Sequence, residues 1–131
     1  MTMAESTSNP RRRTYEFRQL VALVLQVLDV PAQPRPEAPQ TLHERLQAPR
    51  EPSDITGIPG WLIRTHTATN RDLSGALDQA QAAAQEAGTP HFATVWRRHR
   101  RMAQDAYVVL TLQQFGTLLA ESKKNSEDEH E

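Results

Sequence analysis

The chain contains no cysteine, and its only two lysines, Lys123 and Lys124, lie near the C-terminus. Without cysteine it can form neither disulfides nor thiolate metal sites, which fits a reducing compartment. Because there is no other lysine, every lysine-or-arginine position before residue 121 is an arginine. The body of the chain therefore offers no lysine for catalysis.

Long apolar runs are also missing. The longest, Leu20 to Leu28, is interrupted by Gln26 and is too short to cross a bilayer, which needs about 20 apolar residues. The arginine-rich start is not followed by the apolar region of a secretory signal. These features predict a cytoplasmic protein without a membrane partner.

The net charge of -1 hides an uneven distribution. Residues 121–131 carry five acidic residues and two lysines, which leaves thirteen basic and eleven acidic residues before them, a charge of +2. At 131 residues the chain is long enough for one domain. We expect a disordered basic arm over residues 1–13, a single domain over 14–121 with a proline-rich linker over 30–41, and a disordered acidic tail over 122–131.

Hydrophobic spacing predicts three helices, and apolar runs predict three strands. The first helix covers Thr14 to Leu28, with Thr14 as its N-cap, and the second covers Asp72 to Ala87 and stops at Gly88. Thr111 and Gln114 resemble a capping box that opens a last helix through Leu119. The expected strands are Trp61–Ile63, Phe92–Trp96 and Tyr107–Leu110, with a short irregular or edge element at Leu42–Leu46.

The resulting order, α-(β)-β-α-β-β-α, predicts an α/β fold in which helices flank a small mixed β-sheet. The second helix has a narrow face made mostly of alanine, which permits close packing on a sheet. No internal repeat is visible in the sequence.

The most distinctive segment is Asp54-Ile-Thr-Gly-Ile-Pro-Gly-Trp-Leu-Ile-Arg-Thr-His66. It is followed by Asp72-Leu73, the alanine-rich helix, an arginine-rich hairpin and Tyr107-Val-Val-Leu-Thr-Leu-Gln-Gln-Phe115. In this order, over roughly residues 54–119, the chain resembles the Holliday-junction-resolvase-like PD-(D/E)XK nucleases of actinobacterial phages and prophages. The resemblance implies a restriction-endonuclease-like sandwich. Before Asp54 the match is weak.

The resemblance also implies a metal site that this chain has altered. In the family, an aspartate at the Asp54 position and a glutamate at the Arg64 position hold Mg²⁺, and a lysine at the His66 position orients water. Arg64 changes the local charge by two units, and one unit-charge contact at about 4 Å is worth about 4 kcal/mol at a dielectric near 20. We therefore expect no cofactor and no metal, Asp54 being the sole weak candidate ligand. Mg²⁺ would be needed only by an active enzyme.

Two further residues have alternative interpretations. His66 could act as a general base or bind a softer metal with Asp54 and Glu16, but a polar histidine at a strand end is the favoured interpretation. Glu16 could match the family's first-helix glutamate. It is also explained as a first-turn acid that the helix dipole favours.

Arginine clusters are the candidate DNA-binding residues. Four lie in the predicted hairpin, and three precede the first helix: Arg97, Arg98, Arg100 and Arg101, with Arg11, Arg12 and Arg13. Guanidinium groups bind phosphate in bidentate fashion, although charged hairpin tips are also common solvated features.

Three functions follow from these observations. The first is a catalytically degenerate phage or prophage nuclease fold that binds branched or duplex DNA without cleaving it. The second is a protein-interaction module that recruits a phage or host protein, and the third is an active metal-dependent Holliday-junction endonuclease. The resemblance also implies that the chain can form a homodimer.

Overall fold

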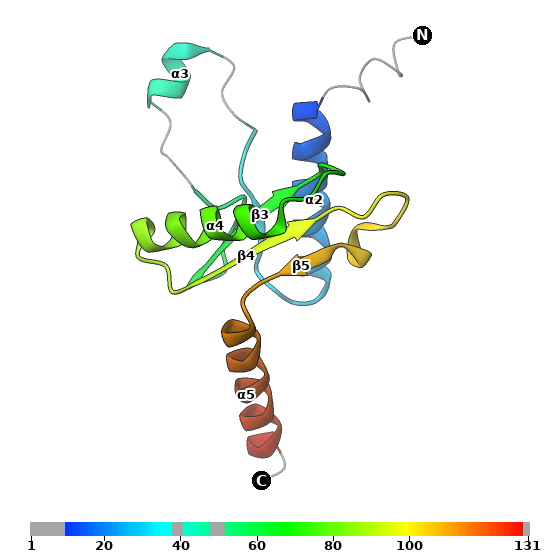
Figure 1. Ribbon diagram of the computed structural model, residues 1–131, viewed down its shortest axis with the longest axis vertical. Helices are drawn as coiled ribbons and strands as arrows, with labels where there is room; N and C mark the ends of the chain where they lie inside the picture. The colour runs from blue at the N-terminus through cyan, green and yellow to red at the C-terminus, as the bar shows by residue number, and fades with distance from the viewer. Residues whose placement is uncertain (1–9, 38–40, 48–51, 130–131) are drawn as a thin grey trace.

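The computed structural model describes residues 10–37, 41–47 and 52–129 (Figure 1). Within them the fold is mixed α/β, with a five-stranded sheet and four α-helices. The elements in order are α2 Pro10–Val27, β1 Gln33–Pro34, α3 Leu42–Gln47, β2 Ile55–Thr56, β3 Trp61–His66, α4 Leu73–Ala87, β4 His91–Trp96, the 3₁₀ turn η1 Ala103–Asp105, β5 Tyr107–Val109 and α5 Leu112–Glu129.

The strands lie in the sheet in chain order, β1-β2-β3-β4-β5. β3 and β4 are parallel, and the other neighbours are antiparallel. A parallel pair needs a long crossover, and α4 supplies it. This arrangement confirms the predicted small mixed sheet flanked by helices.

Helices cover both faces of the sheet (Figure 1). On one face, Phe17 and Val21 of α2 pack with Ile55 and Val95. On the other face, the alanines of α4 pack with Leu62 and Phe92. Ala80 and Ala84 are almost completely buried, which confirms that the alanine face lets α4 approach the strands closely.

Helix α4 ends at the predicted cap, Gly88, and begins one residue later than predicted because Asp72 is its N-cap. Asp72 accepts a hydrogen bond from the backbone N–H of Gly75 at 3.0 Å, and Gly88 ends the helix in the left-handed conformation at φ 72°. At the start of α5, Thr111 accepts a bond from the backbone N–H of Gln114 at 3.2 Å. The Gln114 side chain does not complete the capping box, because its Oε1 accepts a bond from the N–H of Phe92 at 2.8 Å.

The first helix begins earlier than predicted, at Pro10 instead of Thr14. Proline suits the first helical position, where its missing N–H costs nothing. Arg11, Arg12 and Arg13 are therefore helical and do not belong to a disordered arm. Residues 1–9 of that predicted arm lie outside the described part of the chain.

Two later segments also differ from the predictions. Helix α5 continues to Glu129 instead of ending at Leu119, because neither glycine nor proline interrupts residues 120–129. Most of the predicted disordered tail is consequently helical. The expected edge element at Leu42–Leu46 is the short helix α3, where Thr41 accepts a bond from the N–H of Glu44 at 3.1 Å. Of the proline-rich linker, residues 33–34 form strand β1, and residues 38–40 lie outside the described residues.

Among the helices that the structure describes, none is long and apolar enough to cross a membrane.

Candidate functional site

Asp54 lies just before β2, and its carboxylate is buried among donors. Its residue surface is 8% exposed. Oδ1 accepts a bond from Arg35 Nη2 at 2.5 Å and lies 3.6 Å from Arg18 Nη2. Oδ2 accepts bonds from the backbone N–H of Thr65 at 2.8 Å and from the Thr65 hydroxyl at 3.3 Å. Both oxygens are therefore engaged by protein groups.

The two arginines come from separate parts of the chain. Arg18 is on α2 and also donates from Nη1 to the carbonyl oxygens of Arg35 and Pro36, at 2.8 and 3.3 Å. Arg35 directly follows β1. Its backbone N–H donates a hydrogen bond to the backbone carbonyl oxygen of Asp54 at 2.7 Å. Burial lowers the pKa of Arg18, while the neighbouring Asp54 carboxylate acts in the opposite direction. The cluster of Arg18, Arg35 and Asp54 carries a net charge of +1.

Among the described residues, Arg64 forms no ion pair with Asp54. Its Nε instead donates to the Pro52 carbonyl oxygen at 3.2 Å. The sequence drew attention to the positive charge of Arg64, but the arginines that hold Asp54 are Arg18 and Arg35.

His66 lies opposite Trp96 in the parallel register of β3 and β4. Their rings stack with centroids 4.3 Å apart and an interplanar angle of 19°. Burial lowers the pKa of His66, nearby Arg64 lowers it further, and Asp54 opposes both effects. The neutral imidazole is thus favoured, as a polar strand-end residue packed on an aromatic ring.

Glu16 forms its ion pair with Arg12 and not with a residue of the Asp54 cluster. Its Oε1 accepts a bond from Arg12 Nε at 3.1 Å, one turn earlier on α2, and both side chains are more than half exposed. Since α2 begins at Pro10, Glu16 is not in the first turn, and the interpretation as a first-turn acid is wrong.

The residues at Asp54 do not fit Mg²⁺. A hard dication needs free oxygen ligands, whereas two guanidinium groups and Thr65 occupy those of Asp54. Among the residues described, no group of three or more histidine, aspartate or glutamate side chains is arranged to hold a metal ion.

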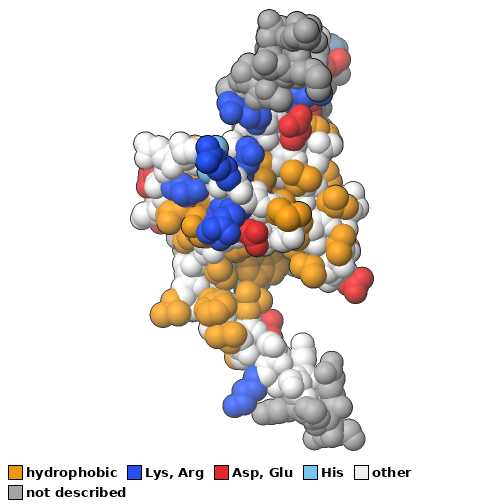
Figure 2. Space-filling view, turned by 90° about the vertical axis from the view of Figure 1, so that its right-hand side faces the viewer, with side chains coloured by type: hydrophobic (Ala, Val, Ile, Leu, Met, Phe, Trp, Pro, Cys, Tyr) orange, Lys and Arg blue, Asp and Glu red, His pale blue; other side chains and the backbone are white. Residues whose placement is uncertain are grey.

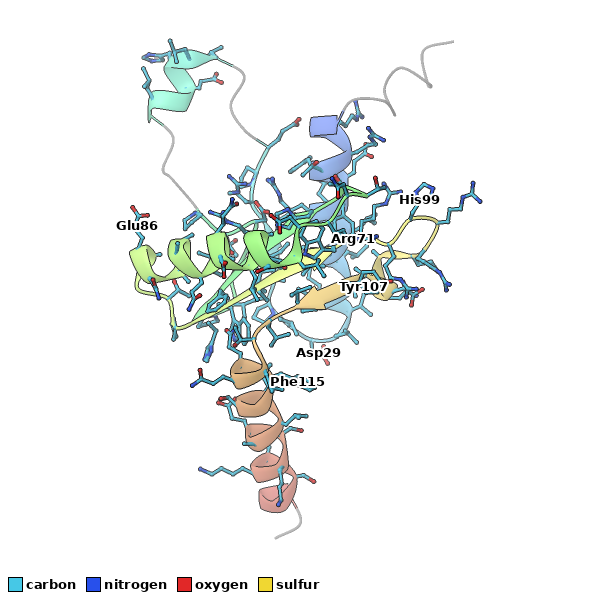
Figure 3. The ribbon with its side chains drawn as sticks, in the orientation of Figure 1. Asp29, Arg71, Glu86, His99, Tyr107 and Phe115 are labelled. Carbon is cyan, nitrogen blue, oxygen red and sulfur yellow. The ribbon has the colours of Figure 1, made fainter. Side chains whose placement is uncertain are left out.

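The arginine-rich turn between β4 and β5 is organised around Tyr107. The guanidinium of Arg98 lies 4.7 Å from the ring centroid and that of Arg71 lies 5.3 Å from it. Arg71 also donates to the Arg97 carbonyl oxygen at 3.1 Å. Figure 3 shows Arg71 and Tyr107 close together, with His99 farther out on the turn. Arg71 was not predicted from the sequence, because it stands alone before α4 with no basic neighbour.

A groove of about 450 Å³ separates this turn from α2. It brings together Arg13 of α2 with Arg97 and Arg101 of the turn, which are 84 or more residues away in the chain. Figure 2 shows arginine side chains gathered on this face beside exposed apolar residues. The lining residues are Arg13, Glu16, Phe17, Leu20, Leu23, Val24, Arg97, Arg101, Met102, Ala103 and Gln104.

The remaining candidate arginines lie elsewhere. Arg12 is paired with Glu16, and Arg98 packs on Tyr107. Arg100 is exposed and adopts a left-handed backbone conformation with φ 60°. The side chain of Arg11 is outside the described residues, although its backbone is helical.

No family model matches the chain, and neither a curated protein nor a solved structure matches it.

Proposed function

We propose that this protein binds DNA, branched or duplex, through the groove between α2 and the arginine-rich turn, and does not cleave it. The single observation that supports the proposal most is that Arg13, Arg97 and Arg101 line one groove. In the same proposal, the chain is a degenerate member of the PD-(D/E)XK nucleases, with their restriction-endonuclease-like sandwich.

The chemistry of the groove suits a phosphate backbone. Three arginines and one acidic residue, Glu16, line the groove, and the Glu16 carboxylate is already paired with Arg12. Guanidinium remains charged at any physiological pH and binds phosphate in bidentate fashion. Arg98 and Arg71, held on the Tyr107 ring, extend the positive surface beyond the groove.

The contacts of Asp54 support the proposed absence of cleavage. A nuclease of this type needs that carboxylate to hold a dication that stabilises developing charge on the phosphate. Arg18 and Arg35 instead neutralise it, and Arg64 adds a further positive charge nearby. A carboxylate with two cationic partners is a poor ligand for a third cation.

The binding experiment compares two double variants with equal charge changes. Arg97→Gln with Arg101→Gln removes two groove cations, whereas Lys123→Gln with Lys124→Gln removes two exposed cations from α5. Fluorescence anisotropy with a labelled duplex and a four-way junction at low salt should show at least tenfold weaker binding, about 1.4 kcal/mol, for the arginine variant alone. Equal losses in the two variants, or no affinity of the natural chain at low salt, would overturn the proposal.

A cleavage assay tests the second half of the proposal. We expect no cutting of either DNA when Mg²⁺ or Mn²⁺ is added. Metal-dependent cleavage that disappears in Asp54→Ala would show that Asp54 still holds a metal and that the protein is an active endonuclease.

A further inference from the structure

An apolar groove of about 700 Å³ lies on the sheet face that α2 covers in part. Strands β3, β4 and β5 form its floor, and α2, η1 and the start of α5 form its walls (Figure 1). Among its lining residues, only Gln104 and Trp61 carry a polar side-chain atom. The lining residues are Val21, Val24, Leu25, Leu28, Val30, Ile58, Trp61, Ile63, Ala93, Val95, Ala103, Gln104, Ala106, Val108, Leu110, Phe115 and Leu118.

The floor of this groove extends beyond the part that α2 covers. Val95 of β4 is buried in the cluster that α2 closes. Its partner in the antiparallel register, Val108 of β5, lines the same groove and is 59% exposed. A contiguous apolar surface that stays uncovered marks a place where another molecule binds.

We propose that this groove, the apolar groove, binds an amphipathic α-helix of a partner protein, with an apolar face toward the groove and lysine or arginine on its polar face. Such a helix laid in a hydrophobic groove is a common mode of recognition between proteins. The inference goes beyond DNA binding and does not depend on it. None of the arginines assigned to DNA lines the apolar groove.

The lining of the apolar groove favours a helix over an extended segment. Peptide N–H and C=O groups that leave water need hydrogen-bond partners, and the lining offers only the side chains of Gln104 and Trp61. A helix brings its own backbone hydrogen bonds, whereas an extended segment would leave its backbone groups unpaired. The small side chains of Ala93, Ala103 and Ala106 let a helix approach closely, as the alanines of α4 do on the other face.

The charges beside the apolar groove select the polar face of the partner. Asp29 lies between lining residues at the end of α2, and Asp105 lies between those of η1 and the segment that follows. Both acidic residues are exposed. The C-terminal end of α2, just before Asp29, adds partial negative charge. Basic side chains that flank the apolar face of a helix complement this rim.

The first test measures the binding of three labelled synthetic peptides to the full chain by fluorescence anisotropy. Two peptides carry leucines on one helical face and differ only in their polar residues, lysine in one and glutamate in the other. The third has the composition of the lysine peptide, but leucine and lysine alternate, a pattern that suits a strand. We expect the helical lysine peptide to bind at least tenfold more tightly than the other two. Equal binding of the three, or no binding of the helical lysine peptide, would overturn the proposal.

The second test locates the bound peptide with two variants of equal charge. Val108→Lys places a cation in the apolar groove and should weaken binding of the helical lysine peptide at least tenfold. Leu112→Lys adds the same charge at a residue that is 83% exposed and outside the lining, and it should bind like the natural chain. Both side chains are more than half exposed, so neither change removes much packing. Equal affinities of the two variants would place the peptide elsewhere and contradict the proposal.

The third test concerns the rim and leaves the lining unchanged. Asp29→Asn combined with Asp105→Asn removes both acidic charges, and asparagine tolerates the left-handed backbone of Asp29 at φ 66°. This double variant should bind the helical lysine peptide more weakly, and the glutamate peptide more tightly, than the natural chain does. If its preference for lysine is unchanged, the rim does not select a basic partner and the proposal is wrong.

Two other occupants of the apolar groove would give different results. If a second copy of the chain binds there, ultracentrifugation should show a dimer that Val108→Lys dissociates and Leu112→Lys does not. If a lipid surface binds there, neutral phosphatidylcholine vesicles should sediment the natural chain but not Val108→Lys. Either result would replace the partner helix and refute the proposal.

Discussion

At the scale of single residues, Asp54 joins three parts of the chain that are distant in sequence. Its carboxylate contacts Arg18 on α2, Arg35 after β1 and Thr65 on β3. Each contact lies between separate elements, so the carboxylate fixes how α2 and the first strands sit against β3. The residue that marks the nuclease resemblance is thus a structural centre of this fold.

Asp54→Asn should destabilise the protein strongly. The amide retains an acceptor for Thr65 but leaves Arg18 buried without a counter-charge, and breaking a buried ion pair costs several kcal/mol. Because Arg35 is partly exposed, we expect a loss of about 2–4 kcal/mol in the free energy of unfolding, measured with urea.

The matched control for Asp54→Asn is Glu16→Gln, which also converts a carboxylate into an amide. It breaks the exposed pair with Arg12 and should cost less than about 1 kcal/mol. Similar losses in the two variants would mean that the Asp54 cluster contributes no more than a surface pair.

His66 should make stability depend on pH. Burial lowers its pKa below the ordinary value of 6.5, so on acidification the unfolded chain takes up a proton before the folded protein does. The free energy of unfolding therefore falls as the pH drops below 6.5, by less than about 1.4 kcal/mol per pH unit, because a single imidazole takes up at most one proton.

His66→Phe keeps an aromatic ring on Trp96 but cannot titrate. Urea unfolding of both proteins at about pH 7.5 and about pH 5 should show a smaller acid-induced loss in the variant. The other titratable groups are common to both proteins and cancel in the comparison. If the free energy of unfolding changes between the two pH values by the same amount in both proteins, His66 is excluded as the source of the pH dependence.

The cluster that holds Asp54 shows why a candidate site is hard to predict residue by residue. Asp54, Arg64 and His66 lie within one segment, so their charges could be compared directly in the sequence. Arg18 and Arg35 reach the same carboxylate only because α2 and β1 pack beside β2 and β3. No local pattern in the sequence records such a long-range contact.

At the scale of elements, the sequence predicted helix ends best where a capping residue lies next to the helix in the chain. Gly88 located the end of α4, and the apolar runs located β3, β4 and β5. The outer ends of α2 and α5 were missed, since polar residues with adequate helix propensity extend them without apolar periodicity. The two-residue strands β1 and β2 are defined by pairing with their neighbours and leave no periodic signal.

The turn between β2 and β3 should require glycine at position 57. Gly57 has φ 86°, and a Cβ there would collide with the Pro31 carbonyl oxygen. Gly57→Ala should therefore combine a conformational cost of about 1–2 kcal/mol with a clash against the segment that leads into β1. We expect a clear fall in thermal stability.

Gly88→Ala separates these two costs. Gly88 also has a positive φ, at 72°, but a Cβ there would meet nothing within 4 Å. This variant should show only the conformational cost in stability and no cost from a clash. Its melting temperature should therefore lie well above that of Gly57→Ala. Equal melting temperatures would show that the backbone near Pro31 moves aside at no cost.

At the scale of the whole molecule, net charge is a poor guide to the groove that we propose for DNA binding. The chain as a whole carries a charge of -1, yet the fold gathers three arginines in one groove and two more around Tyr107. Since salt screens charges beyond about 10 Å at 0.1 M, the local group decides how a phosphate backbone is bound. Acidic residues elsewhere in the sequence have little influence at that range.

The salt dependence of DNA binding should therefore show whether each groove arginine neutralises a phosphate. Each phosphate neutralised adds about 0.9 to the slope of log affinity against log salt, so Arg13→Gln should lower the magnitude of that slope by about 0.9. Lys124→Gln removes the same charge from α5 and should leave the slope unchanged. Anisotropy titrations of a duplex between about 50 and 200 mM salt measure this slope. If Arg13→Gln weakens binding equally at every salt concentration, Arg13 supports the fold of the groove without contacting phosphate.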